Sequence, residues 1–352
     1  MTLDTIPDHH SKLDYRGKRL QIPQQQAHDI IRAILSAIGC DAMTAEEVAS
    51  HLTETSLHGI ESHGVMRILQ YASQFQSGYM TPSATAELLR TDAGIWQVSG
   101  HGGIGIPVMR MAFDQVMTLA GDTGIAAVSI HDVGHTGRHG AFADRAAEAG
   151  FLTITIGGGN RATWRQVAPH GGARPMLPTN PWCIGIPGGN DSPVVIDFAT
   201  SKFAGGWIYA ARSAGASLPE DCLIDRDGNP TTDPEDYFDG GAILPAGEHK
   251  GYALALMAEM IGEAMLGAVA TEANWLVIAI DTRKYQPADR MTTLAEEILA
   301  DIRSCPPRPG FSKVEIPGER ERQHHADAGG MIPLPEETWQ QIKALAHSLG
   351  CG

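Results

Sequence analysis

The feature that most constrains the fold is a middle block, residues 92–245, in which short apolar runs alternate with helix-like segments. Runs bounded by Gly and Pro predict strands, and apolar residues at helical spacing predict helices between them. We expect strands over 95–99, 125–131, 151–156, 182–187 and 193–198, and helices over 106–119 and 138–149. The block therefore predicts a domain of the α/β class.

Helical patterns lie on both sides of this block. Pro23 opens a helix that Gly39 closes, and Thr44–Glu47 has the pattern of a capping box for the next helix. After the block we expect an apolar, buried helix over 249–266, a strand over 274–281, and helices over 294–302 and 336–349. We expect a flexible N-terminal lead (1–19), a discontinuous helical domain (20–91 and 246–352) and an α/β cofactor- and substrate-binding domain (92–245).

Charge and cysteine content narrow the function. The formal net charge of −15 argues against nucleic acid and anionic membranes as partners. An anionic substrate then requires a locally positive pocket. Five cysteines without regular spacing predict reduced thiols and a cytoplasmic location. The polar N-terminus predicts no signal peptide, and no run is long enough for a membrane span.

The stretch 57–67 is the strongest candidate for catalysis. Ser62 has the pattern of a helix N-cap, and His63 and Arg67 would then lie four apart on one face of that helix. Arg can hold a carboxylate through two hydrogen bonds while His exchanges a proton with a carbonyl oxygen, which suits a 2-oxo acid. The alternative is a solvated pair of cations at a helix start.

Two glycine-containing motifs have competing interpretations. Gly100–Gly105 matches G-x-G-x-x-G after a strand and before a helix, which indicates either a dinucleotide fingerprint or a glycine-rich turn. The run 225–236 resembles a calcium loop, but Pro230 occupies the position that requires glycine and Asp236 replaces the final Glu. We expect a polar hairpin loop there and no metal site.

Three further segments offer polar groups at the ends of predicted elements. The loop 134–140 can receive an anion at a helix N-terminus, or needs its glycines only for the turn. Asp197 ends an apolar strand and either partners a histidine in a proton relay or caps a helix. His249 and Lys250 open an apolar helix, where the lysine either binds phosphate or is solvated.

These segments together, in this order, resemble the malate/L-lactate dehydrogenase family of the second type. Pro178–Pro181 and the run Leu244–Gly251 add to the match, which covers residues 20–345. The family also contains ureidoglycolate, sulfolactate and diketogulonate oxidoreductases and Δ1-piperideine-2-carboxylate reductase. The resemblance implies a homodimer of α+β type, with a discontinuous helical domain and an α/β domain of largely antiparallel sheet. It implies no classical Rossmann fold, so Gly100–Gly105 becomes a structural turn.

The resemblance also implies residue roles. His63 matches the proton donor, Ser62 its hydrogen-bonded neighbour, Arg67 the carboxylate clamp and Asp197 the acid completing the relay. His135 and Thr179 match the substrate pocket. Segments that match cofactor contacts supply Val194, Ile196, Phe198, Thr200, His249, Lys250 and Gly318.

The expected reaction is hydride transfer between NAD or NADP and C2 of a small 2-hydroxy or 2-oxo acid. One alternative is reduction of a cyclic imino acid, and another is a catalytically inactive ligand-binding homologue. Two departures bear on the choice. Many relatives have Thr-Asn-Ser where this chain has Gly157–Asn160, which removes side chains from a predicted nicotinamide-facing loop. Pro178 also replaces a usual glycine.

Overall fold

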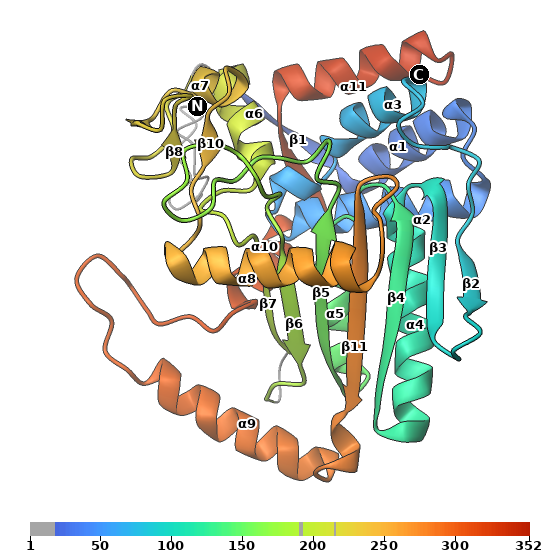
Figure 1. Ribbon diagram of the computed structural model, residues 1–352, viewed down its shortest axis with the longest axis vertical. Helices are drawn as coiled ribbons and strands as arrows, with labels where there is room; N and C mark the ends of the chain where they lie inside the picture. The colour runs from blue at the N-terminus through green and yellow to red at the C-terminus, as the bar shows by residue number, and fades with distance from the viewer. Residues whose placement is uncertain (1–17, 190–192, 215) are drawn as a thin grey trace.

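A seven-stranded sheet forms the centre of the molecule (Figure 1). The computed structural model describes residues 18–189, 193–214 and 216–352. The strands lie in the order β2 (Glu87–Arg90), β3 (Trp96–Gly103), β4 (Ile125–Val133), β11 (Ala273–Asp281), β5 (Phe151–Gly159), β6 (Trp182–Ile186) and β7 (Val194–Phe198). Every neighbouring pair is antiparallel except β3 and β4, which are parallel. The prediction of a largely antiparallel sheet is confirmed.

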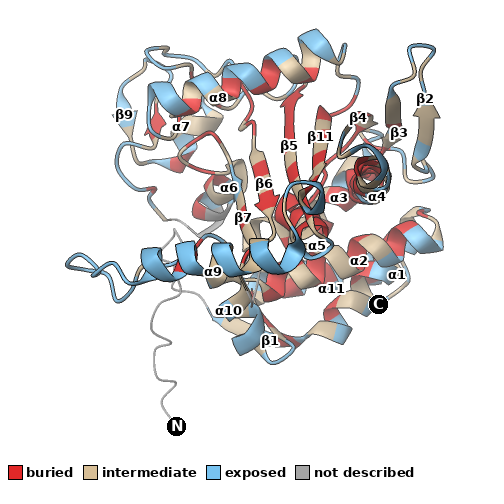
Figure 2. Ribbon diagram, turned by 90° about the horizontal axis from the view of Figure 1, so that it is seen from below, coloured by how far each residue is buried: buried red, intermediate tan, exposed pale blue. Residues whose placement is uncertain are grey.

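Helices cover both faces of this sheet. On one face α4 (Gly105–Thr123) and α5 (His139–Glu148) pack against the strands. Ile106, Met109 and Phe113 of α4 are spaced three or four apart and fully buried, so this helix presents one apolar stripe to the sheet. On the other face lie α8 (His249–Glu259) and the π-helical turn Met260–Met265, as Figure 2 shows.

The N- and C-terminal segments meet in a helical layer next to the sheet. It contains α1 (Gln24–Ile38), α2 (Ala42–Leu57), α3 (Arg67–Gln76) and α11 (Glu336–Ser348). An antiparallel pair, β1 (Arg19–Pro23) and β12 (Met331–Pro335), ties the two segments together. The expected helical segment 246–352 also supplies β11, the central strand of the sheet, so it contributes to both layers. The predicted lead 1–19 lies outside the described residues except for Lys18 and Arg19.

Two local predictions are wrong. The N-cap of α2 is Asp41, whose carboxylate accepts from the backbone N–H groups of Met43 and Thr44 at 2.9 Å, so Thr44 lies inside the helix. The helix at 249–266 is not buried all round, because Leu256, Met257 and Met260 expose 43–53 % of their surface. Its outer face has no partner among the described residues.

Smaller elements lie around this body. A three-stranded sheet of β8 (Leu223–Ile224), β9 (Pro230–Thr231) and β10 (Ala242–Ile243) packs with α6 (Gly205–Ala214) and α7 (Pro234–Phe238). The Asp225 carboxylate accepts from the N–H groups of Asp227 and Asn229, which confirms the polar hairpin loop. Helix α9 (Ala288–Arg303) extends away from the sheet, and α10 (Glu319–Ala328) follows it (Figures 1 and 2).

The glycines of Gly100–Gly105 have a packing role. A Cβ on Gly100 would lie 2.5 Å from Cγ1 of Val133, and one on Gly105 would lie 2.5 Å from Cγ2 of Thr136. Because these two glycines have no side chain, β3 and the start of α4 can approach the end of β4 closely. In the described part of the chain, no helix combines the length and apolar character that crossing a membrane requires.

Candidate active site

His63 lies in a short 3-10 turn, Glu61–His63, and α3 begins only at Arg67. The prediction that one helix carries both residues, with Ser62 as its N-cap, is therefore wrong. Gly64 has an extended backbone, and a Cβ there would lie 2.1 Å from Oγ of Ser56. That hydroxyl accepts from the N–H of Val65 at 2.9 Å and so holds the chain in a turn between the two elements.

Arg67 nevertheless comes back to the His63 turn. Its Nε donates to the backbone oxygen of Ser62, and Nη1 donates to Oε1 of Gln70. Oγ of Ser62 lies 2.9 Å from Nδ1 of His63, as the predicted hydrogen-bonded neighbour should. Burial, followed by the charge of Arg67, lowers the pKa of His63 well below its usual value. The imidazole is therefore neutral at pH 7.

A second imidazole, His135, lies beside the first. Its ring centroid is 5.3 Å from that of His63, and its side chain is 8 % exposed. Nδ1 of His135 accepts from the N–H of Gly137 at 3.2 Å and from the hydroxyl of Tyr71 at 2.7 Å. Because Nδ1 is an acceptor, the hydrogen of the neutral ring is on Nε2. The structure thus brings His63, Arg67 and His135 together.

Glu272 is a buried acid of this site that the sequence did not indicate. It is 6 % exposed, and its Oε2 has no hydrogen-bond partner. Burial raises its pKa to about 8, although the positive charge of Arg67 opposes this rise. Its N–H donates to the oxygen of Val133, next to the loop of His135, at 3.0 Å. No motif surrounds it, because its burial depends on pairing between β4 and β11.

Asp197 contacts α5 rather than the imidazole of His63. Its Oδ2 accepts from the N–H of Gly140 at 2.7 Å, which satisfies a free backbone donor at the start of that helix. It also opposes the burial that lowers the pKa of His139. Nδ1 of His63 instead forms its hydrogen bond with Oγ of Ser62. Ser62 is thus the hydrogen-bonded neighbour that was expected, and among the described residues no hydrogen bond joins Asp197 to His63. The part of Asp197 in a relay stays a prediction.

A groove of about 350 Å³ runs between the edge strand β7 and the start of α10. Three of the residues matched to cofactor contacts line it, namely Ile196, Phe198 and Gly318. Arg138, Arg320 and Ile60 also line it, and Ile60 leads directly into the His63 turn. Phe198 is 41 % exposed, so it offers an open aromatic surface in the groove.

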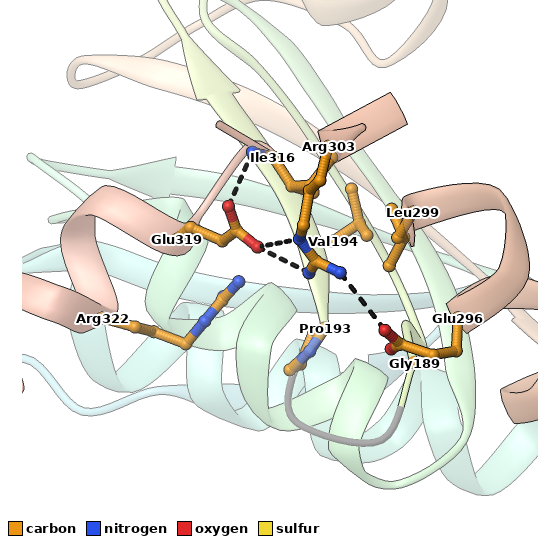
Figure 3. A pocket seen from close by; sticks show the side chains of 9 residues that line it. All are labelled: Gly189, Pro193, Val194, Glu296, Leu299, Arg303, Ile316, Glu319 and Arg322. Atoms are coloured by element: carbon orange, nitrogen blue, oxygen red, sulfur yellow. Dashed lines mark hydrogen bonds and ion pairs between the residues drawn. The ribbon is translucent and has the colours of Figure 1, made fainter. Parts of the chain in front are cut away.

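Val194 lies outside this groove. It lines a depression of about 10 Å³, together with Arg303 and two carboxylates. Figure 3 shows Glu319 and Glu296 directed at the guanidinium of Arg303, which binds both. A space of this size holds about one water molecule. The structure therefore places Val194 beside an ion-pair cluster that adjoins the groove, since Ile316 lines both spaces.

The remaining predicted residues gather at the start of α8. Both the N–H and the hydroxyl of Thr200 donate to the backbone oxygen of Thr179 at 2.9 Å. A Cβ on Gly251 would lie 2.5 Å from the oxygen of Thr200, so the first turn of α8 packs closely on this pair. His249 and Lys250 are exposed at that turn. Thr200 thus supports the backbone here with its hydroxyl already occupied.

Gly157–Gly159 belong to β5 and not to a loop. A Cβ on Gly158 would lie 2.9 Å from Oε1 of Glu259, and one on Gly262 would lie 2.1 Å from the nitrogen of Gly158. The buried Glu259 carboxylate accepts from the N–H of Gly159 at 3.0 Å and from Nδ2 of Asn180 at 2.6 Å. These glycines let α8 and its π-helical turn approach the strand.

Comparisons with known proteins agree with this architecture. A family model described as malate/L-lactate dehydrogenase matches residues 22–343. The chain is 30 % identical to the Δ1-pyrroline-2-carboxylate/Δ1-piperideine-2-carboxylate reductase of Pseudomonas putida, over 93 % of this chain and 97 % of that protein. It is 31 % identical to an L-lactate dehydrogenase of Cupriavidus necator, over 94 % of this chain and 98 % of that protein.

A solved structure gives the same result for the fold. A putative malate/lactate dehydrogenase from E. coli aligns with a TM-score of 0.86 and 28 % identity, over 94 % of this chain and 96 % of that chain. The family model covers nearly the whole length of the chain. The chain therefore belongs to the malate/L-lactate dehydrogenase family.

Proposed function

We propose that the chain transfers a hydride between NAD(P) and C2 of a small 2-hydroxy or 2-oxo acid, with His63 as the acid–base group. The main support is the position of His63, held by Ser62 beside Arg67 and His135. Arg67 binds the substrate carboxylate, and the charged pair orients C2 and its oxygen toward the imidazole. The role of Thr179 in the substrate pocket stays a prediction, and its backbone oxygen accepts from Thr200.

The protonation state of His63 defines its part in each direction. With hydrogen on Nδ1 donated to Ser62, the lone pair of Nε2 is available to take a proton. In oxidation the neutral imidazole accepts the hydroxyl proton, while the hydride leaves C2. In reduction the imidazolium returns this proton to the developing alkoxide. A carboxylate bound to Arg67 cancels part of the charge that lowers the pKa of His63, so substrate binding favours the imidazolium.

The groove between β7 and α10 fits a dinucleotide. NAD(P)H, when bound, supplies the hydride that C2 receives. The exposed ring of Phe198 and the apolar Ile196 suit a flat heterocycle. Arg138 and Arg320 suit a pyrophosphate, which would share them with their present partners Asp144 and Glu321. Nε of Arg138 is buried without a hydrogen-bond partner, so this guanidinium has a donor to offer. Gly318 is the N-cap of α10, whose first turn carries Glu319 and Glu321.

The direct test is an absorbance screen at 340 nm with NADH and NADPH in turn. Pyruvate, phenylpyruvate, oxaloacetate and Δ1-piperideine-2-carboxylate are supplied side by side. We expect reduced cofactor to be consumed with at least one 2-oxo acid. A thermal shift with cofactor but no turnover with any of the four compounds would instead support a ligand-binding homologue.

Reduction of a cyclic imino acid is the second candidate, and Glu272 favours it. A carboxyl group with a pKa of about 8 carries its proton at neutral pH and can donate it to a basic imine nitrogen. The same screen separates the candidates, since the imino acid then gives the highest kcat/KM. In that case Glu272→Gln should lower imine reduction more than 2-oxo acid reduction.

We also propose a cytoplasmic homodimer. The outer face of α8 exposes Leu256, Met257 and Met260, a continuous apolar surface of the kind that mediates subunit contacts. None of the five cysteines forms a disulfide, which suits a reducing compartment.

A further inference from the structure

Away from the active site, α2 and α10 bring a carboxylate and two imidazoles together. Glu54 and His58 are one turn apart on α2, and His325 faces them from α10. One ligand atom from each residue lies within 4.8 Å of the others. None of the three belongs to the expected catalytic residues or lines the groove.

Hydrogen bonds and a ring contact fix the relative positions of the three side chains. Nε2 of His325 lies 3.1 Å from Oε2 of Glu54, and the two imidazole centroids are 4.7 Å apart. Nδ1 of His58 lies 2.8 Å from the backbone oxygen of Glu54. Because a carbonyl only accepts, this Nδ1 carries the hydrogen, and Nε2 keeps its lone pair.

The carboxylate also has an orienting partner. Oε1 of Glu54 accepts from Nε2 of Gln24 at 2.7 Å, which leaves Oε2 on the side of the histidines. Metal-binding histidines typically donate their second N–H to a carbonyl or carboxylate, and ligand carboxylates are themselves hydrogen-bonded. His58 and Glu54 both have such outer partners.

We propose that Glu54, His58 and His325 bind a divalent transition-metal ion of the Zn²⁺ type. Two imidazole nitrogens and one carboxylate oxygen are ligands that this ion prefers in proteins, and water can complete a tetrahedral shell. The overall charge of −15 also favours cation binding.

The ion would tie α10 to α2. The opposite end of α10 forms a wall of the groove through Gly318 and Arg320. Arg322 of the same helix lies 3.7 Å from the carboxylate of Asp144. The bound ion therefore restrains the helix that limits the groove, and hydrogen exchange of the α10 amides should slow when Zn²⁺ is added.

The test uses tag-free full-length protein treated with EDTA and then titrated with Zn²⁺ in a calorimeter. We expect one equivalent to bind per chain and the thermal midpoint to rise. His325→Ala removes an exposed ligand and should weaken binding by more than about tenfold, since even outer-shell changes cost about 10- to 100-fold. Gln24→Ala should give a smaller loss. Binding should also weaken as the pH falls, because protons compete with the metal ion for its ligands.

The matched control is His101→Ala. His101 is an exposed histidine 2.8 Å from the Glu87 carboxylate, with no second imidazole in its ion pair. This variant should bind Zn²⁺ as the wild type does. Wild-type affinity in His325→Ala, an equal loss in His101→Ala, or no saturable binding to the unaltered chain would each overturn the proposal. Equal thermal midpoints in EDTA establish that His325→Ala is folded.

Discussion

Replacing Arg67 by lysine should strongly reduce activity even though the positive charge is kept. The guanidinium already uses Nε on Ser62 and Nη1 on Gln70, and a Cβ on Gly206 would lie 3.3 Å from Nη2. The same guanidinium thus holds the His63 turn, and its remaining N–H groups are left to bind a substrate. Lysine has a single nitrogen and cannot serve both purposes.

The size of the effect follows from the loss of a charge-assisted hydrogen bond, because lysine keeps the charge but not the second donor. Such a bond contributes about 1.5–3 kcal/mol. At about 1.4 kcal/mol per factor of ten, kcat/KM for a 2-oxo acid should fall roughly 10- to 140-fold. The assay is steady-state absorbance at 340 nm with saturating reduced cofactor, and thermal midpoints check the fold.

Arg90→Lys is the control, because Arg90 is exposed on β2, away from the site. It should retain wild-type kinetics. If Arg67→Lys stays within about threefold of the wild type, the guanidinium does not bind the substrate carboxylate and the reasoning fails.

Three further predictions concern packing, assembly and pH. Gly158→Ala forces a Cβ to 3.0 Å from the backbone oxygen of Ala258, so chemical denaturation should show that the free energy of unfolding falls by about 1–3 kcal/mol. Gly121→Ala, whose Cβ meets no atom within 4 Å, should be neutral or stabilising. Equal effects of the two variants would contradict the packing role of Gly158. Replacing Leu256 and Met257 with Glu should convert the proposed dimer to a monomer, measured by light scattering. Met43→Glu, at another exposed position, should leave the dimer intact. An unchanged mass in the first variant would exclude the outer face of α8 as the dimer interface. Burial lowers the pKa of His51 to about 3 in the folded chain. As the pH falls, His51 is therefore protonated in the unfolded chain before it is protonated in the folded chain. The unfolding free energy should therefore fall by up to about 1.4 kcal/mol per pH unit below pH 6.5, and His51→Gln should reduce this slope; an unchanged slope would show that other groups cause it.

Local patterns predicted the elements that local interactions determine. Gly39, which was expected to end the first helix, adopts a positive φ of 110° at the end of α1. The strands of the middle block also occur close to their expected bounds. Such patterns could not predict which strands pair when they are far apart in the sequence. Strand β11 lies between β4 and β5, and β1 pairs with β12.

The candidate site was predicted in part. His63, Ser62 and Arg67 lie together as expected, but a turn stabilised by Ser56 joins them instead of a helix. The interaction of Asp197 with Gly140, and the burial of Glu272, depend on which segments become neighbours in the folded chain. Spacing along the sequence does not contain that information.

The central claim is that His63 moves the proton when C2 receives or loses its hydride. The most direct measurement is the single-turnover rate of hydride transfer, followed by stopped-flow absorbance at 340 nm, in the wild type and in His63→Ala. A positioned acid is typically worth about 10²- to 10⁴-fold, so the variant should lose about that much rate while its cofactor affinity stays nearly unchanged. A wild-type rate of hydride transfer in His63→Ala would contradict the account.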